Sequence, residues 1–271
     1  MTSKVVERFL RYVQIDTRAD EESVTFPSSE KQKNLGRLLA KELTEMGASD
    51  VWFDEEYGYV YAKIPATDGV KSKKTIAFIA HMDTAPDISG TDVKPQIISD
   101  YEGTDIVLNE ELGIVLSPEK FPELKDYIGK SLITTDGTTL LGADDKAGVA
   151  EIMTMAEELL MHPEWEHGSV AIVFTPDEEV GAGVDHIDLE RLGADYGYTV
   201  DGGALGELEY ENFNAASAIV QVKGVNVHPG EAKNKMKHAA LIGMELEQML
   251  TMTTPSIISK KQLNMEVAML H

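Results

Sequence analysis

The chain has 271 residues, of which 42% are apolar and 26% are charged, and its formal net charge is −23. This composition is ordinary for a folded globular protein and excludes a collagen-like or wholly disordered chain. So large an excess of acid excludes nucleic acid and anionic lipid as favoured partners, because their phosphates would be repelled. We also expect no membrane span, since no apolar run approaches the roughly 18 residues that cross a bilayer.

The chain has no cysteine. Disulfides, thiol catalysis and thiolate metal ligands are therefore excluded, and any metal site must be built from His, Asp and Glu. The first residues, MTSKVVERFLRYVQ, lack the apolar core and small-residue cleavage site of a secretory signal. Together these features predict a cytoplasmic protein.

The first 80 residues predict two helices followed by three strands. Residues 1–17 form an amphipathic pattern, and a second helix is expected over 29–46, where Leu recurs at helical spacing before Gly47. Strands are expected over 50–53, 57–64 and 75–80. The last of these, TIAFIA, is an unbroken apolar run, as expected for a strand that is buried on both faces.

The middle of the chain predicts further alternation of strands and helices. Residues 83–130 are rich in Pro, Gly, Asp and Glu and are expected to be mostly loop. Residues 131–135 and 138–141 flank an Asp-Gly pair and predict a hairpin. A helix is expected from Asp145, and buried strands over 169–175 and 196–203. The pattern predicts the α/β class, with a mixed, largely parallel sheet flanked by helices.

The pattern changes after about residue 212, which suggests a second domain. Residues 216–224 alternate apolar and polar positions and predict a half-exposed strand, and a helix is expected over 233–250. One strand and one helix cannot bury their apolar faces alone. We therefore expect domains over 1–212 and 213–271, the second being the incomplete start of an α+β domain.

Four polar clusters directly follow predicted strands or open a predicted helix. They are HMDTAPD (81–87), GADDKAG (142–148), TPDEEVG (175–181) and TVDGG (199–203). Ligand sites of open α/β sheets gather at the carboxyl ends of the strands. The spacing therefore predicts that the four clusters meet at one edge of the sheet.

Each cluster also has an ordinary structural interpretation. His81 can be a strand-end histidine, and the Asp144–Asp145 pair can cap a helix and balance its dipole. Glu178 and Glu179 can be surface residues, and Asp201 can belong to a turn.

The combination of clusters favours a metal site. One imidazole with three carboxylates suits zinc and related divalent ions, and carboxylates packed together need cations or protons to compensate their charge. Asp83, two residues after His81, is placed to orient the imidazole. Two ions could share a bridging carboxylate and activate a water molecule, with a further carboxylate as general base.

The motifs resemble those of the peptidase T family of tripeptide aminopeptidases, which use two zinc ions. The resemblance covers about residues 1–245 and rests on six motifs in the family's order: HMDTAPD, LLGADDKAGVAEIMT, FTPDEEVG, YTVDGG, ELEYENFNAAS and NVHPG. Wider relatives, which include deacylases and carboxypeptidases, share the His-x-Asp, Asp-Asp and Glu-Glu elements. The sequences GADDKAG and ENFNAA are similar to those of peptidase T in particular.

The resemblance implies a role for each site residue. One zinc is bound by His81 and Asp201, and Asp144 bridges both zinc ions. The second zinc is bound by Glu179. The catalytic residues implied are Asp83, which orients the imidazole, Glu178, the general base, and His228, which stabilises the scissile carbonyl. The substrate implied is a tripeptide, and residues 213–271 correspond to the start of a lid and dimerisation domain, which leaves a homodimer open.

The sequence departs from the family after about Leu250. In the family a histidine from a C-terminal segment completes the second zinc site, and no residue here matches it; His271 lacks the surrounding motif. We therefore expect a C-terminally truncated member. Two further interpretations stay open: a catalytically inactive fragment that retains partial zinc binding, and a deacylase or carboxypeptidase on the same scaffold.

Overall fold

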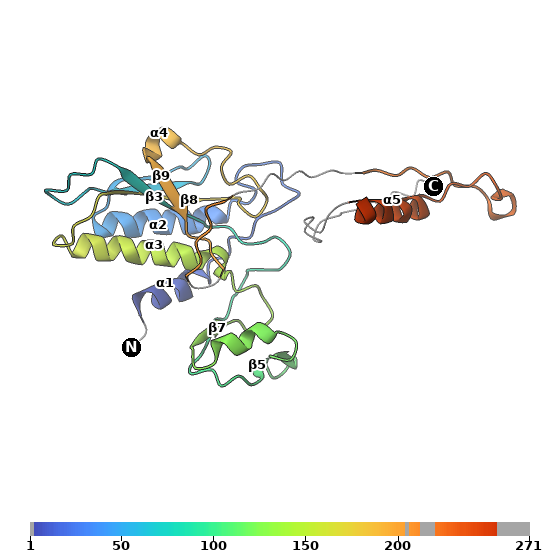
Figure 1. Ribbon diagram of the computed structural model, residues 1–271, viewed down its shortest axis with the longest axis horizontal. Coiled ribbons are helices and arrows are strands. Elements are labelled where there is room, and N and C mark those ends of the chain that lie inside the picture. Colours follow the sequence, from blue (N-terminus) through green and yellow to red (C-terminus); the bar gives the residue numbers. More distant parts are fainter. Residues whose placement is uncertain (1–2, 204–205, 212–219, 254–271) are drawn as a thin grey trace. The chain divides into compact units, whose positions relative to one another are not determined.

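The computed structural model describes residues 3–203, 206–211 and 220–253 (Figure 1). The chain divides into two compact units, Met1–Leu208 and Glu209–His271, and each is described by itself. Among the described residues, no helix is both long enough and apolar enough to cross a membrane.

The first unit is built on a five-stranded sheet in the order β1-β2-β8-β3-β9. The strands are β1 (Ser49–Phe53), β2 (Val60–Ile64), β3 (Thr75–His81), β8 (Ser169–Thr175) and β9 (Tyr196–Thr199). Strands β8, β3 and β9 run parallel, whereas β2 pairs antiparallel with both β1 and β8. The expected mixed, largely parallel sheet of an α/β fold is therefore confirmed.

Three helices cover one face of this sheet (Figure 1). They are α1 (Lys4–Tyr12), α2 (Gln32–Met46) and α3 (Ala143–Met161). Helix α2 ends where Gly47 adopts φ 90°, a left-handed conformation that favours glycine. Apolar side chains of the helices and the sheet form the main core, whose fully buried members include Leu35, Leu39, Leu43, Val149, Met153, Ile172 and Phe174.

The opposite face carries a smaller apolar cluster beneath the short helix α4 (Leu189–Leu192). Tyr59, just before β2, and Tyr61 of β2 contribute the largest side chains, and both hydroxyls accept backbone N–H groups of the segment that leads into α4. This second layer covers the other face of the sheet, so that most residues of β2 and β8 are buried.

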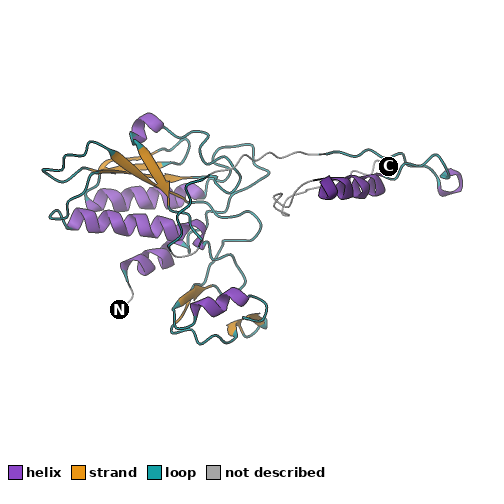
Figure 2. Ribbon diagram, viewed as in Figure 1, coloured by secondary structure: helices purple, strands orange, loops and turns teal. Residues whose placement is uncertain are grey.

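A separate lobe is inserted between β3 and α3, and Figure 2 shows its strands and short helix. It contains β4 (Gln96–Ile98), β5 (Ile106–Asn109), β6 (Ile114–Leu116), the 3₁₀ helix η1 (Pro122–Tyr127) and β7 (Leu132–Thr134). The segment expected to be mostly loop thus has its own secondary structure.

The hairpin expected around Asp136–Gly137 is wrong. Strand β7 pairs antiparallel with β4 instead, with Ile133 opposite Ile97, and residues 138–141 form no strand. The Asp-Gly turn itself is present, because the Asp136 carboxylate accepts the backbone N–H of Thr138. The following residues turn away, since the N–H of Leu140 donates to the carbonyl of Ser89.

The second unit contains the 3₁₀ helix η2 (Pro229–Glu231) and helix α5 (Ala239–Thr253). The helix predicted over 233–250 is therefore present with a later start. The strand predicted over 216–224 lies partly outside the described residues, and residues 220–224 form no strand.

A core substitution tests the packing of α2 against the sheet. Leu39 is fully buried in the main core, and we expect Leu39→Ala to lower the free energy of unfolding by about 2–5 kcal/mol through lost burial and a residual cavity. Urea unfolding followed by circular dichroism measures this change. The matched control on the same helix is Lys41→Ala, which removes an exposed ion pair with Glu45 and should cost under about 0.5 kcal/mol. Equal effects from the two variants would contradict the packing described.

Candidate metal centre

The fold brings the four polar clusters to one edge of the sheet. His81 is the last residue of β3, and Asp201 follows the end of β9 by two residues. Glu178 and Glu179 follow the end of β8, and Asp144 lies in the first turn of α3. Since β8, β3 and β9 are parallel, their carboxyl ends meet at the same edge.

Three side chains form a cluster able to hold a metal ion, namely His81, Asp144 and Asp201, whose ligand atoms all lie within 4.8 Å of one another. The Nε2 atom of His81 is 2.8 Å from Oδ1 of Asp144 and 3.8 Å from Oδ2 of Asp201. Oε2 of Glu178 is 3.9 Å from the same nitrogen. His81 is buried whereas Asp144 is exposed, so the cluster opens toward solvent on the Asp144 side.

Asp83 orients both His81 and the two glutamates. Nδ1 of His81 lies 3.1 Å from the carbonyl oxygen of Asp83 and 3.3 Å from its Oδ1. These acceptors favour the tautomer with the proton on Nδ1, which leaves the lone pair of Nε2 directed at the cluster. The carboxylate of Asp83, fully buried, also accepts the backbone N–H groups of Glu178 and Glu179, each at 3.1 Å. One side chain therefore connects β3 to the turn after β8.

Asp145 was predicted from the sequence only to cap a helix, but in the structure it also joins two elements of the site. Its peptide bond to Asp144 is cis, and the two carboxylates lie in different environments. Asp145 is 3% exposed. Its Oδ2 accepts the backbone N–H of His81 at 3.1 Å, and its Oδ1 accepts that of Gly148 at 3.2 Å. Asp145 thus connects the end of β3 to the first turn of α3, with Asp144 between them.

The acidic surroundings keep a proton on His81. Burial lowers the pKa of His81, but the hydrogen bond and charge of Asp83, with the charge of Asp145 and the hydrogen bond to Asp144, outweigh burial and raise this pKa to about 10. An imidazolium is therefore the cation that compensates this site when no metal ion is bound.

The carboxylates of the site also hold protons more tightly than usual. Burial, together with the charge of Asp201, raises the pKa of Asp145 to about 8, and burial with the charge of Asp144 raises that of Glu179 to about 7. The pKa values of Glu178 and Asp201 are raised, again chiefly by burial. Burial thus disfavours the charged carboxylates, and the charges of neighbouring acids add to this effect, which a divalent cation would relieve. The donor set, imidazole nitrogen and carboxylate oxygens, fits zinc and similar ions.

Two further buried charged residues border the site and were not singled out from the sequence. Lys146 follows Asp145 and donates from Nζ to the carbonyl of Ile15 at 2.7 Å, and burial lowers the pKa of this lysine to about 8. Asp177 precedes Glu178 and is 1% exposed. The signal for both was their position inside the motifs: Asp177 directly precedes Glu178, and Lys146 lies two residues after Asp144.

The position of His228, the remaining predicted site residue, is described within its own unit. It lies in the second unit, where it is exposed and precedes η2, and its Nδ1 accepts the backbone N–H of Gly230 at 3.2 Å. Within the first unit the structure brings together His81, Asp83, Asp144, Glu178, Glu179 and Asp201.

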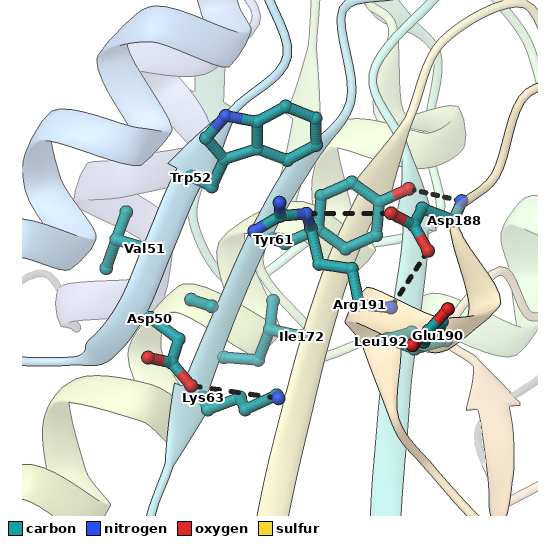
Figure 3. Close-up of a pocket in the computed structure, with 11 residues that line it drawn as sticks. Asp50, Val51, Trp52, Tyr61, Lys63, Ile172, Asp188, Glu190, Arg191 and Leu192 are labelled. Carbon is teal, nitrogen blue, oxygen red and sulfur yellow. Dashed lines mark hydrogen bonds and ion pairs between the residues drawn. The ribbon is translucent and has the colours of Figure 1, made fainter.

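A separate cavity of about 560 Å³ lies over β1, β2 and α4 (Figure 3). The guanidinium of Arg191 lies 3.9 Å from the ring centroid of Trp52 and 3.7 Å from the carboxylate of Asp188. Lys63 likewise lies 3.7 Å from a carboxylate oxygen of Asp50. These two pairs offset four of the five charged residues that line the cavity, and Glu190 adds one negative charge, so the excess of acid is smaller here than at the metal centre.

The role of Asp83 gives a direct prediction. Asn in its place offers one acceptor oxygen instead of two, so one of the two glutamate N–H groups loses its partner. We expect Asp83→Asn to weaken zinc binding by about 10–100-fold, the usual effect of losing a group that orients a metal ligand. Competition with a chromophoric chelator measures the affinity. Asp87→Asn, which changes an exposed carboxylate on the same loop, should leave it unchanged, and an equal loss in both variants would count against this role.

Comparison with known proteins gives close relatives. The chain is 63% identical over 248 residues to a peptidase T of Caldanaerobacter subterraneus subsp. tengcongensis, covering 92% of this chain and 60% of the relative. It is 62% identical over 243 residues to a peptidase T of Desulfitobacterium hafniense, covering 90% of this chain and 58% of the relative. The chain thus spans about three fifths of the length of these relatives. No family model matches it.

Two solved structures share the fold. A tripeptidase from Staphylococcus aureus has a TM-score of 0.51 at 26% identity, over 74% of this chain and 43% of its own. The aminopeptidase PepT from Bacillus cereus has a TM-score of 0.54 at 25% identity, over 90% of this chain and 56% of its own. The chain is therefore a homologue of the peptidase T proteins over nine tenths of its own length.

Proposed function

We propose that the protein is a zinc-dependent metallo-aminopeptidase that releases the N-terminal residue of tripeptides. The observation that carries this proposal is the convergence of His81, Asp144 and Asp201 at the carboxyl ends of parallel strands, with Asp83 orienting the imidazole. The identity of 63% to a protein named peptidase T supports the choice of substrate class.

The residues of the site divide into metal-binding and proton-transfer roles. His81, Asp144 and Asp201 would hold one zinc ion, and Asp144 with Glu179 would contribute to a second. Divalent ions in such a site polarise the scissile carbonyl and lower the pKa of a nucleophilic water. Asp83 and Asp145 hold these ligands through hydrogen bonds to their backbone or ring nitrogens.

Glu178 is the proposed general base. Its carboxylate is about half exposed and faces His81 Nε2 at 3.9 Å, and burial raises its pKa, which favours accepting a proton from water. As the water oxygen bonds to the peptide carbon and the C–N bond breaks, Glu178 passes that proton to the departing amine. The products are a free amino acid and a dipeptide. His228 is proposed to steady the oxyanion, as the resemblance implies.

The remaining assignments follow from the same resemblance. We propose residues 1–212 as a zinc-dependent catalytic domain and residues 213–271 as part of a lid and dimerisation domain, with a homodimer as the assembly. A cytoplasmic location is supported by the absence of cysteine.

A second candidate function is single-zinc binding without turnover. It is favoured by the metal cluster of the described residues, which supplies ligands for one ion. The match covers 60% of the first relative's length, and the other two fifths of that protein leaves room for further metal ligands there.

The decisive experiment combines zinc stoichiometry with hydrolysis of a tripeptide by the same sample. Turnover of a free tripeptide, with an N-acetylated tripeptide left intact, would establish an aminopeptidase. One bound zinc per chain without turnover would select the second candidate. Both candidates would be contradicted if the native chain bound no zinc and if Asp144→Ala gave the same zinc stoichiometry and the same hydrolysis as the native chain.

A further inference from the structure

The turn that carries Glu178 and Glu179 is anchored by a buried carboxylate with no assigned role. Asp177 is 1% exposed and has a φ of 53°, a left-handed conformation that Asp tolerates better than most residues. A buried carboxylate is costly unless it is well hydrogen-bonded. Its partners therefore indicate what it does.

Asp177 is hydrogen-bonded to the residues that lead into α2. Its carboxylate accepts the backbone N–H and the hydroxyl of Ser28, and Nε2 of Gln32 donates to it at 2.7 Å. The backbone N–H of Asp177 in turn donates to Oε1 of Gln32 at 3.2 Å. Gln32 is therefore both donor and acceptor to the same residue. We call Ser28, Gln32 and Asp177 the Asp177 clamp.

Further hydrogen bonds, besides those of the clamp, hold the turn in place. Asp83 accepts the N–H groups of Glu178 and Glu179 from the side of β3. The N–H of Ala182 donates to the carbonyl of Asp177 at 2.9 Å, which closes the turn. The two glutamates thus lie on a segment held by Asp83 on one side and by the Asp177 clamp on the other.

We propose that Asp177 is a positioning residue: with Ser28 and Gln32 it fixes the backbone of the Glu178–Glu179 turn to the start of α2, and so aims both glutamates at the metal cluster. The proposal rests on the proposed function for the roles of Glu178 and Glu179. A merely structural role would predict a loss of overall stability without a change in the local order of the turn or in the geometry of a bound ion.

The first test measures hydrogen exchange of the Glu178 and Glu179 amides in the metal-free protein. Asp177→Asn places an amide group against donors and breaks the clamp. We expect exchange at the two amides to become about tenfold faster, as for loss of a local hydrogen-bonded contact. The matched control is Asp188→Asn, which removes the carboxylate that accepts the N–H of Arg191 at α4. It should leave both amides unchanged.

A reciprocal substitution provides the rescue. In the double variant Asp177→Asn with Gln32→Glu, the new amide can donate to the new carboxylate, so donor and acceptor are exchanged rather than lost. Gln32→Glu alone sets two carboxylates side by side and should disturb the turn. We expect the double variant to restore the native exchange rates. Ser28→Ala, which removes one donor only, gives a milder test, with an expected increase of about threefold, if Asp177→Asn fails to fold.

Co²⁺ provides a second readout, because its visible spectrum reports ligand geometry. We expect the Co²⁺ spectrum of Asp177→Asn to differ from that of the native chain, and the spectrum of the double variant to match the native one. Native exchange rates and a native spectrum in Asp177→Asn would overturn the proposal. If the native chain binds no Co²⁺, the proposed function is at fault, and the exchange rates of the metal-free protein still decide the role of Asp177.

Discussion

Replacing His81 by alanine is expected to weaken zinc binding by at least about a hundredfold, the upper end of what loss of an orienting partner costs. His81 supplies the only imidazole in the metal cluster of the described residues. Its loss also leaves Asp83 and Asp145, both almost fully buried, without the cation that faces them. The metal-free variant should therefore lose about 3–5 kcal/mol of stability, as when one partner of a buried charge pair is removed.

The matched control for this prediction is His162→Ala. His162 is exposed, lies 2.8 Å from the carboxylate of Glu164 and stacks on Trp165, so it resembles His81 in having acidic neighbours but lies outside the cluster. Zinc affinity is measured by chelator competition, and stability by urea unfolding in EDTA. The assignment of the site would be wrong if the two alanine variants bound zinc equally well.

The stability of the metal-free protein should fall as the pH rises from 5 to 9. In the folded state the pKa of Asp145 is raised to about 8, that of Glu179 to about 7 and that of His81 to about 10. The unfolded chain releases the carboxylate protons near pH 4 and the imidazole proton near pH 6.5. From pH 5 to about 8 these three groups make the folded state hold more protons, so stability decreases with pH. Above about pH 8 Lys146, whose folded pKa is lowered to about 8, opposes this decrease.

Other carboxylates do not reverse this slope. Asp16, Asp136 and Asp195 have lowered pKa values, so their stabilising contribution is lost only at more acidic pH and is constant above pH 5. Because each unit of pKa shift is worth about 1.4 kcal/mol, we expect a loss of several kcal/mol across the window. Urea midpoints at pH 5, 7 and 9 in EDTA measure it.

Two comparisons sharpen this result. Asp145→Asn removes the buried acid and should flatten the profile, so that the variant is the more stable form at pH 9. With zinc present, stability should instead rise with pH. Zinc binding displaces protons from its ligands, so it strengthens as the pH rises. A native profile in Asp145→Asn would show that the acid cluster does not govern stability.

The sequence predicted the fold and much of the site because those features depend on local patterns. Buried strands such as 75–80 are continuous apolar runs, and polar residues directly after them must lie at the sheet edge. The site carboxylates and His81 were found in this way. The pairing of β7 with β4 was missed, because a turn signal at Asp136–Gly137 reports the turn but not which distant strand becomes the partner.

The buried residues Asp145 and Asp177 show a second limit. Their sequence neighbours are acidic too, and adjacent carboxylates look alike until the backbone assigns one to solvent and the other to the interior. Asp144 is exposed whereas Asp145 is buried. Asp177 reaches Gln32 across 145 positions of the chain. Contacts over such separations depend on tertiary packing, which local patterns do not encode.

Strand β9 is short, exposed along its length and, among the described residues, paired to β3 alone. Such an edge strand ordinarily frays first. Asp201 lies two residues after its end, and His81 and Asp144 are 63 positions apart in the chain. An ion held by these three side chains would link β9, β3 and α3 in the folded state and would stabilise that state by binding to it in preference to the unfolded chain. The chemistry of the site would then also decide how cooperatively the sheet opens, with the edge strand β9 held to its neighbour β3 and to α3.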